Sequence, residues 1–405
     1  MDLIKIITTL TAIFLLGCSR ADSGVNVTTI DIHYSDFPGF PITNIFINEN
    51  GPYPFLIDTG STSSSMSSVV AAKIGLNEDH LDTVNTARMN QYSVERLSDT
   101  TKVSFPNTQI HRNIKFRIID PEDVKPYVGV LGLDVLINSN LKNLPLERKF
   151  ELTLPNKAYE CDILSKSSKC FDLSKDLPMV PSQLGGADLA LLIDTGNHGY
   201  KSFLFANNSL NKAIWEKYGR HTTSGMTKLS NKPVKFLKSS DFIFNKNETC
   251  YADFIIRDPD DTTFVFQENF AILGWFSIRK VTFEIDFATG NITYPSDNCP
   301  YGKLNTLGIG SFSATDNQEE ALIGLIEIGS PAYEAGLKNG DWVQRIHLEN
   351  GDTIEKFDAV FFNNPDWHVY ADAGTDLKFD IIRGEDKMQF KIETRIPEFI
   401  NMTIP

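Results

Sequence analysis

The stretch "PFLIDTGSTSS" (residues 54–64) decides the fold, and "LALLIDTGNHGY" (189–200) repeats its pattern. In both, a run of apolar residues ends in Asp-Thr-Gly. Aspartate is a poor strand residue, and removing a carboxylate from water costs free energy unless hydrogen bonds compensate. An acidic residue at the end of two apolar strands therefore indicates a chemical role for Asp58 and Asp194.

The residues after each aspartate offer that compensation. Threonine can hydrogen-bond locally, glycine lets the backbone turn sharply and present its N–H, and the next side chain is expected to donate to the carboxylate. These supporting residues are Thr59, Gly60 and Ser61 in the first stretch and Thr195, Gly196 and Asn197 in the second.

Further along, each motif is followed by two apolar residues and a glycine, in "VLGLDVL" (130–136) and "ILGWFSI" (272–278). This order of landmarks predicts an internal repeat of about 140 residues, built from two copies of one β-rich unit. Two aspartates that meet between the copies could share one proton, because close like charges cannot both ionise easily. Such a pair suits acid–base activation of a water.

The local pattern predicts several elements. Asn50-Gly51 and Thr289-Gly290 lie between strand-like runs and predict hairpins, and residues 66–76 and 207–219 are expected to be helical. No Gly-x-Ser-x-Gly surrounds the serines of "STSSSMSS" (61–68), so a helix start explains them better than a nucleophile.

The paired motifs resemble the two catalytic halves of an aspartic protease and are most similar to bacterial retropepsin-like aspartyl proteases joined in one chain. This resemblance implies a mainly β fold with two related lobes and a catalytic dyad of Asp58 and Asp194. It also implies that Thr59 and Thr195 cross-link the two loops, while Gly132 and Gly274 lie in turns behind them.

The resemblance leaves four points open. The flap expected over a substrate has two candidates, residues 87–99 and 218–229, and His198 could perturb Asp194. Asn197 stands where serine or threonine is usual, so the support of the second carboxylate differs. The alternative to a working endopeptidase is a catalytically inactive envelope protein that binds peptides. Two motifs in one chain make a dimer of chains unnecessary.

The C-terminal segment resembles a PDZ domain in "TLGIGSF" (306–312) and "GSPAYEAGLKNGDWVQRI" (329–346). In such β/α domains a peptide adds as a strand and its C-terminal carboxylate meets backbone N–H groups. The resemblance assigns that loop to Leu307, Gly308, Ile309 and Gly310. The alternative is a groove that is covered or packed on the lobes.

The first residues predict export. The apolar run from Ile6 to Leu16 is short for a membrane span and fits a signal peptide. "LLGC" resembles a bacterial lipobox, which implies lipidation of Cys18 and attachment to a cell-envelope membrane facing the periplasm or cell surface; an ordinary cleaved signal is the alternative. Four cysteines follow later in the chain: Cys161, Cys170, Cys250 and Cys299. They predict two disulfides, which could be paired in three ways, and a Cys161–Cys170 bridge is favoured.

Composition narrows the function further. The 405 residues are 41% hydrophobic and carry a formal net charge of −14, with no basic patch, so nucleic acid is not expected as a partner. The cysteines and histidines do not have the spacing of metal ligands, so no metal site is predicted, and no cofactor is expected. The expected partners are a polypeptide substrate, a peptide C-terminus and a membrane.

These arguments divide the chain into seven parts. They are a signal peptide (1–17), a tether (18–28), a first protease lobe (29–160), a connection (161–182), a second lobe (183–298), a PDZ-like domain (299–397) and a tail (398–405).

Overall fold

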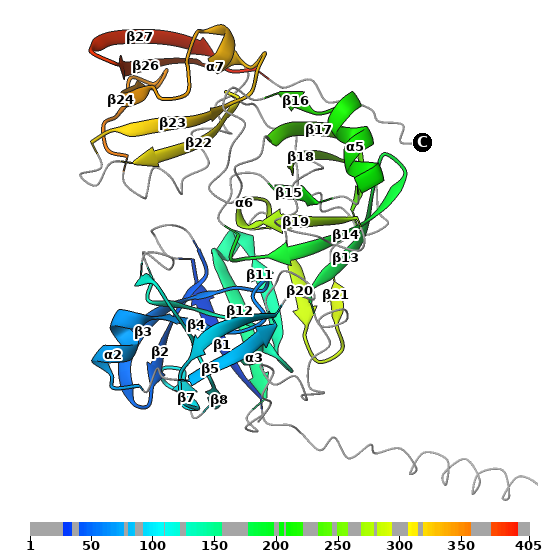
Figure 1. Cartoon of the computed structure of the whole chain (residues 1–405), viewed down its shortest axis with the longest axis vertical. Coiled ribbons are helices and arrows are strands. Elements are labelled where there is room, and N and C mark those ends of the chain that lie inside the picture. Colours follow the sequence, from blue (N-terminus) through cyan, green and yellow to red (C-terminus); the bar gives the residue numbers. More distant parts are fainter. Residues whose placement is uncertain are drawn as a thin grey trace, which may run out of the picture.

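The protein is described here from a computed structural model. It describes residues 27–34, 40–76, 80–85, 92–108, 110–121, 127–155, 177–197, 202–205, 208–221, 234–244, 249–257, 269–278, 282–293, 307–314, 319–357 and 374–395. Strands dominate these residues and form four sheets (Figure 1).

The largest sheet has nine strands in the order β5-β6-β9-β4-β10-β3-β2-β7-β8, and we call it, with its helices, the first lobe. Its strands are β2 (Ile42–Ile47), β3 (Asn50–Ile57), β4 (Ser65–Ser67), β5 (His80–Asn85), β6 (Tyr92–Leu97), β7 (Thr101–Ser104), β8 (His111–Ile114), β9 (Arg117–Ile119) and β10 (Gly129–Leu131). Its helices are α2 (Ser68–Lys73) and α3 (Leu133–Leu136).

The second lobe is a sheet of seven strands in the order β13-β14-β19-β15-β18-β17-β16. Its elements are β13 (Met179–Leu184), β14 (Ala187–Asp194), β15 (Ser202–Phe205), α5 (Asn208–Lys217), β16 (Arg220–His221), β17 (Val234–Phe244), β18 (Thr249–Arg257), β19 (Phe270–Gly274) and α6 (Trp275–Ile278). Because β13 also pairs with β17, this sheet curls back on itself.

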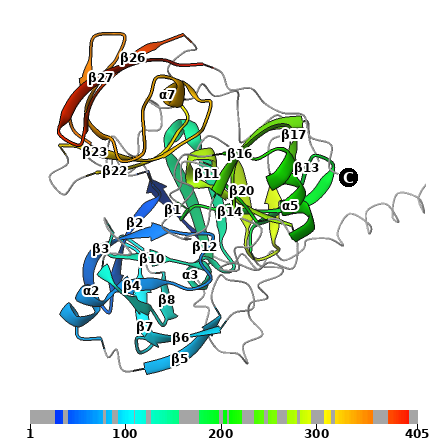
Figure 2. The same ribbon diagram turned by 45° about the horizontal axis from the view of Figure 1, so that its top comes forward.

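A five-stranded sheet joins the two lobes. It runs β1 (Val27–His33), β12 (Lys149–Pro155), β11 (Asn140–Leu144), β20 (Phe283–Asp286) and β21 (Asn291–Thr293). The junction is the antiparallel pair β11–β20, where the Asn140 side-chain amide donates to Glu284 Oε1 at 2.7 Å. Figure 2 shows β11 and β20 together in the centre of the molecule. Residues far apart in sequence thus hold the lobes together through main-chain hydrogen bonds.

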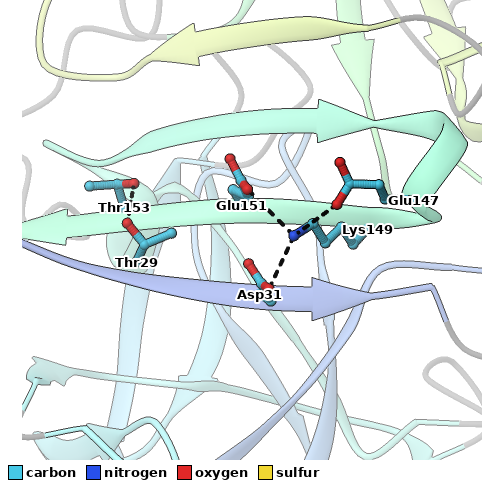
Figure 3. Close-up of polar contacts among 6 residues, drawn as sticks. All are labelled: Thr29, Asp31, Glu147, Lys149, Glu151 and Thr153. Carbon is cyan, nitrogen blue, oxygen red and sulfur yellow. Dashed lines mark hydrogen bonds and ion pairs between the residues drawn. The ribbon is translucent and has the colours of Figure 1, made fainter.

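Charged side chains cover one patch of this joining sheet. The amino group of Lys149 lies 3.1 Å from Asp31 on β1, 3.1 Å from Glu147 in the 3-10 turn η2 (Pro145–Glu147) and 3.4 Å from Glu151 (Figure 3). The carboxylates of Glu147 and Asp31 raise the pKa of Lys149. The Lys149 side chain is largely covered, but Asp31 and Glu147 are exposed, so these ion pairs contribute little to stability.

Among the described residues, Trp275 is the largest fully buried side chain, and it lies at the centre of an aromatic cluster between the lobes. It comes from α6, yet its ring centroid lies 4.9 Å from that of Tyr34 and 5.7 Å from that of Phe150, both in edge-to-face geometry. Phe40 approaches it at 6.1 Å. Since Tyr34, Phe40 and Phe150 belong to the N-terminal half, the apolar core is continuous across the two lobes.

Residues 307–395 form a separate unit with its own core. Its sheet runs β22 (Ile309–Ala314), β23 (Ala321–Ile326), β24 (Trp342–His347), β26 (Asp376–Arg383) and β27 (Asp386–Glu393), while β25 (Thr353–Ile354) pairs with β24. The short helix α7 (Pro331–Glu334) is capped by Ser330, whose hydroxyl oxygen accepts from Tyr333 N at 3.3 Å. In the described residues β22 lies at an edge of this sheet.

Most sequence-based elements are found, with one shift. The hairpin predicted at Asn50-Gly51 exists, but its turn is Asn48-Glu49, both at positive φ. Gly51 lies within β3 instead, where a Cβ would be 2.8 Å from the Ile45 carbonyl oxygen, so glycine is needed there for close strand approach. The helices predicted within residues 66–76 and 207–219 are α2 and α5, and the hairpin at Thr289-Gly290 joins β20 to β21.

The strands also extend past two expected boundaries. β1 begins at Val27, within the expected tether, and β13 begins at Met179, within the expected connection. In the described ranges, the helices are too short or too polar to cross a membrane.

We expect Trp275→Ala to lower the free energy of unfolding by about 3–5 kcal/mol, because it empties the space between three aromatic rings. Urea unfolding followed by circular dichroism measures this loss. Leu146→Ala, at a fully exposed apolar position, is the control and should change stability by less than about 0.5 kcal/mol. Equal losses in the two variants would show that the aromatic cluster does not hold the lobes.

Candidate active site

The two Asp-Thr-Gly turns occupy equivalent places in the two lobes. Asp58 follows β3, which pairs in parallel with β10, and Asp58 N donates to the Leu131 carbonyl at 3.0 Å. Asp194 ends β14, which pairs in parallel with β19, and it lies opposite Gly274. The apolar strands are buried, so each aspartate emerges where its strand leaves the core. The repeat predicted from the sequence therefore brings two carboxyl groups to one place.

The threonines cross-link the two turns, as the resemblance implies. Thr59 Oγ1 donates to the Ile193 carbonyl at 2.6 Å, and Thr195 Oγ1 donates to the Ile57 carbonyl at 2.7 Å. Each hydroxyl oxygen also accepts from the backbone N–H of the other threonine: Thr195 Oγ1 accepts from Thr59 N at 3.0 Å, and Thr59 Oγ1 accepts from Thr195 N at 3.2 Å. Both threonines are fully buried. Four hydrogen bonds between the lobes thus fix the relative position of the turns.

The glycines make room for the opposite carboxyl groups. A Cβ on Gly60 would lie 2.4 Å from Asp194 Cγ, and one on Gly196 would lie 2.1 Å from Asp58 Cγ. Each carboxyl therefore rests directly over the other turn. Gly60 N donates to Asp58 Oδ1 at 2.8 Å, and Gly196 N donates to Asp194 Oδ1 at 3.0 Å. No other residue type fits either position without displacing a carboxyl group.

The two carboxyl groups are electrostatically coupled. Burial raises the pKa of both Asp58 and Asp194 above the ordinary aspartate value, and the nearby Asp58 charge raises the pKa of Asp194 further. A hydrogen bond joins the two side chains, and both residues are half-buried. A pair in this arrangement holds one proton between the oxygens of its two carboxyl groups.

The side chains of Ser61 and Asn197 are predicted to donate hydrogen bonds to the two carboxyl groups, but backbone N–H groups supply donors there. The Ser61 hydroxyl donates to the Ser63 carbonyl oxygen at 2.8 Å, so its single hydrogen does not serve the carboxylate as predicted. The Asn197 amide lies against Gly274, where a Cβ would be 3.2 Å from its Nδ2. The backbone N–H groups of Ser61 and Asn197 lower the pKa of the two aspartates instead.

Gly132 and Gly274 lie directly behind the two turns. A Cβ on Gly132 would be 2.7 Å from the Ser61 carbonyl oxygen. The residues after these glycines bond the turns in the same way: Leu133 N donates to Ser61 O at 2.9 Å, and Trp275 N donates to Asn197 O at 3.0 Å.

Sequence reasoning missed three neighbours of the site. Tyr127 is buried, and its pKa is raised by burial and by the charge of Asp58. Ser64 and Asp134 are hydrogen-bonded to each other behind the first turn. The predicted helix start does not explain the serines, because Ser67 makes no side-chain cap bond to α2. An acidic residue inside the apolar "VLGLDVL" was the available signal for Asp134.

Other predicted residues lie away from this site or outside the described residues. Leu307 and Gly308 belong to the C-terminal unit, where Ala332 N donates to the Leu307 carbonyl oxygen at 3.0 Å and Gly308 has φ +77°. Ile309 begins β22 and Gly310 follows it. The flap candidates fall partly on hairpins, β5–β6 and β16–β17. Outside the described residues are Cys18, Cys161, Cys170, His198 and Cys299, and of Cys250 only the backbone is described.

The described residues include no group of three or more His, Cys, Asp or Glu side chains placed to hold a metal ion.

Comparison with known proteins adds one family match. Residues 43–138 match the family described as gag-polyprotein putative aspartyl protease, a range that includes Asp58 and Gly132. Over that range the first lobe is similar to this family, and the described residues of the chain are mainly β. No curated protein matches the chain.

Two solved structures resemble parts of the chain. A retropepsin-like aspartic protease from Rickettsia conorii is 20% identical, with 32% of this chain and 92% of that chain covered and a TM-score of 0.24. The PDZ domain of a carboxy-terminal protease from Vibrio cholerae, in complex with a peptide, is 17% identical, with 23% and 94% covered and a TM-score of 0.18.

Thr195→Val should lower the free energy of unfolding by about 1–3 kcal/mol, because valine keeps the shape but leaves buried partners at Thr59 and Ile57 unsatisfied. Chemical unfolding measures the effect. Thr29→Val is the matched control, since the Thr29 hydroxyl meets Thr153 at 3.0 Å on an exposed strand pair (Figure 3) and should change stability by less than about 0.5 kcal/mol. A Thr195 variant as stable as this control would contradict the cross-link.

Proposed function

We propose that the chain is an aspartic endopeptidase, in which Asp58 and Asp194 activate a water for peptide-bond hydrolysis. The observation that supports this most strongly is the mutual placement of the carboxyl groups, each resting over the glycine of the opposite turn. The four hydrogen bonds of Thr59 and Thr195 keep that placement. The family match of residues 43–138 supports the same reaction class.

The proposed reaction uses the one proton of the pair. Asp58, the ionised partner, takes a proton from the water as it attacks the carbonyl carbon of the scissile bond. Asp194 donates its proton to the carbonyl oxygen, which gives a tetrahedral diol. As the carbon–nitrogen bond then breaks, Asp58 gives its proton to the leaving amine and a diol hydroxyl returns a proton to Asp194, which restores the one-proton pair. The backbone N–H groups of Gly60 and Gly196 hold the carboxyl groups in position throughout.

We also propose that residues 307–395 are a PDZ-like module that recognises a peptide C-terminus. β22 lies at a sheet edge among the described strands, and it follows the loop of Leu307 and Gly308. A left-handed Gly308 lets the backbone pass close to Ser330, where a Cβ would be 2.0 Å away. An extended peptide could then pair with β22 while its carboxylate meets this loop. Lipidation at Cys18 would hold the enzyme at a cell-envelope membrane.

Purified protein should cleave a library of unstructured peptides, with inhibition by pepstatin, and Asp58→Asn should lower kcat/KM by at least about 10²–10⁴-fold. Asparagine keeps the acceptor for Gly60 N, so the fold should persist. Asp188→Asn, at an exposed position of the same strand as Asp194, is the matched control and should cleave like the wild type. An inactive wild type would favour a peptide-binding scaffold instead.

The pH dependence of kcat/KM should be bell-shaped, with its maximum above about pH 4, the ordinary aspartate range. Burial raises both pKa values, so the one-proton form of the pair persists to higher pH than it would between exposed aspartates. Activity should fall at low pH as Asp58 gains a proton and at high pH as Asp194 loses its own. Initial rates across buffers measure the profile, and a maximum confined below pH 4 would count against it.

A further inference from the structure

A second buried carboxyl group lies directly behind the first turn. Asp134 is the second residue of α3 and is only 7% exposed. Its Oδ2 accepts from Ser64 N at 2.8 Å, and its Oδ1 lies 2.5 Å from Ser64 Oγ. The residues beside it in α3, Leu133 and Val135, are completely buried. Burying a carboxylate among such neighbours costs free energy unless hydrogen bonds compensate it, and here the compensation comes from Ser64.

The direction of the Ser64 hydrogen bond follows from its other partner. Gly132 N donates to Ser64 Oγ at 3.0 Å, so this oxygen is already an acceptor and its hydrogen is directed to Asp134. Leu133 N donates to the Ser61 carbonyl oxygen at 2.9 Å. The segment Ser61–Ser64 is therefore bonded at both ends to Gly132–Asp134. We call this arrangement the Asp134 clamp, and it begins three residues after Asp58.

The second lobe keeps the backbone part of this arrangement but not the carboxyl group. Gly274 N donates to Ser202 Oγ at 3.2 Å, which parallels the bond from Gly132 to Ser64. The residue two positions after Gly274 is Phe276, where the first lobe has Asp134. The space at the glycine is also wider, since a Cβ on Gly274 would lie 3.2 Å from its nearest neighbour, against 2.7 Å for Gly132. The two turns are therefore supported unequally.

We propose that Asp134 is a positioning residue for Asp58, and that its clamp makes the first turn the more rigid half of an unequal pair. This inference rests on the proposed peptidase activity. Asp134 itself does not touch the reacting atoms. It acts through Ser64 on the segment that follows Asp58, so its loss should affect the chemical step more than substrate binding. A shift of about 1 Å in a reacting group can cost about 10²-fold in rate.

The protonation of Asp134 gives this role a signature of its own. Burial raises the pKa of Asp134 to about 6, while hydrogen bonds from Ser64 act in the opposite direction. The elements packed against α3 are β10, which has no titratable side chain, and β8, which carries His111 and Arg112. The Arg112 guanidinium donates to the His111 carbonyl oxygen at 3.1 Å. A protonated Asp134 loses one of its two acceptor oxygens, so the clamp weakens below this pKa.

The test compares kcat, KM and the pH profile of kcat in the wild type, Asp134→Asn and Ser64→Ala. Asparagine cannot accept both Ser64 donors, so kcat should fall about tenfold or more while KM stays within about twofold. In the wild type kcat should change near pH 6, where Asp134 titrates. This step should disappear in Asp134→Asn, move to higher pH in Ser64→Ala because the side-chain hydrogen bond that lowers the pKa of Asp134 is lost, and persist in the Asp188→Asn control. If Asp134→Asn does not fold, Ser64→Ala still tests the clamp, because it removes only the hydroxyl link.

The outcomes separate the two proposals. If the wild type is active and both variants keep its kcat and its step near pH 6, the positioning role is overturned and the proposed peptidase activity stands. A wild type that cleaves no peptide would overturn both. A rise in KM with unchanged kcat would also contradict the inference, because it would place Asp134 in substrate binding rather than in positioning of Asp58.

Discussion

Two buried threonine hydroxyls determine how the rest of the site is arranged. Each one reaches across the junction to a main-chain carbonyl at the end of the opposite strand, so neither Asp-Thr-Gly turn is complete without the other lobe. The carboxyl groups of Asp58 and Asp194 then have one place to go, above the opposite glycines. The joining sheet and the aromatic cluster around Trp275 resist separation of the lobes, and in doing so they protect this contact.

The same contact is electrostatically unfavourable when both aspartates are ionised. Burial raises both pKa values, and a group whose pKa is raised on folding stabilises the fold at low pH and loses that contribution as pH rises through the raised value. The free energy gained by burial of the apolar core therefore offsets the cost of holding two carboxyl groups close together. Such a cost is typical of sites where a perturbed carboxyl group performs chemistry. Sharing one proton lowers the cost and creates the acid–base pair in the same step.

The sequence was sufficient to predict the two Asp-Thr-Gly turns and the glycines packed behind them, because each depends on a local motif that keeps the same order in both halves. It was insufficient where an interaction depends on a distant partner. The Ser61 hydroxyl turned toward Ser63, and the hairpin turn formed at Asn48-Glu49 because Gly51 was needed against Ile45. Asp134 is an acidic residue within an apolar segment, and only the fold shows that Ser64 is its partner. The strand pairing of β11 with β20 had no local signal at all.

The most direct test of the account is a titration of the aspartate carboxyl carbons by ¹³C NMR, with Asp58→Asn used to assign the pair. The account predicts two coupled transitions, one of them for a carboxyl group that keeps its proton well above the ordinary aspartate pKa. In the Asp58→Asn variant the coupling should vanish and Asp194 should titrate alone. If both aspartates instead lost their protons independently near pH 4, they would not share a proton, and the central claim would be wrong.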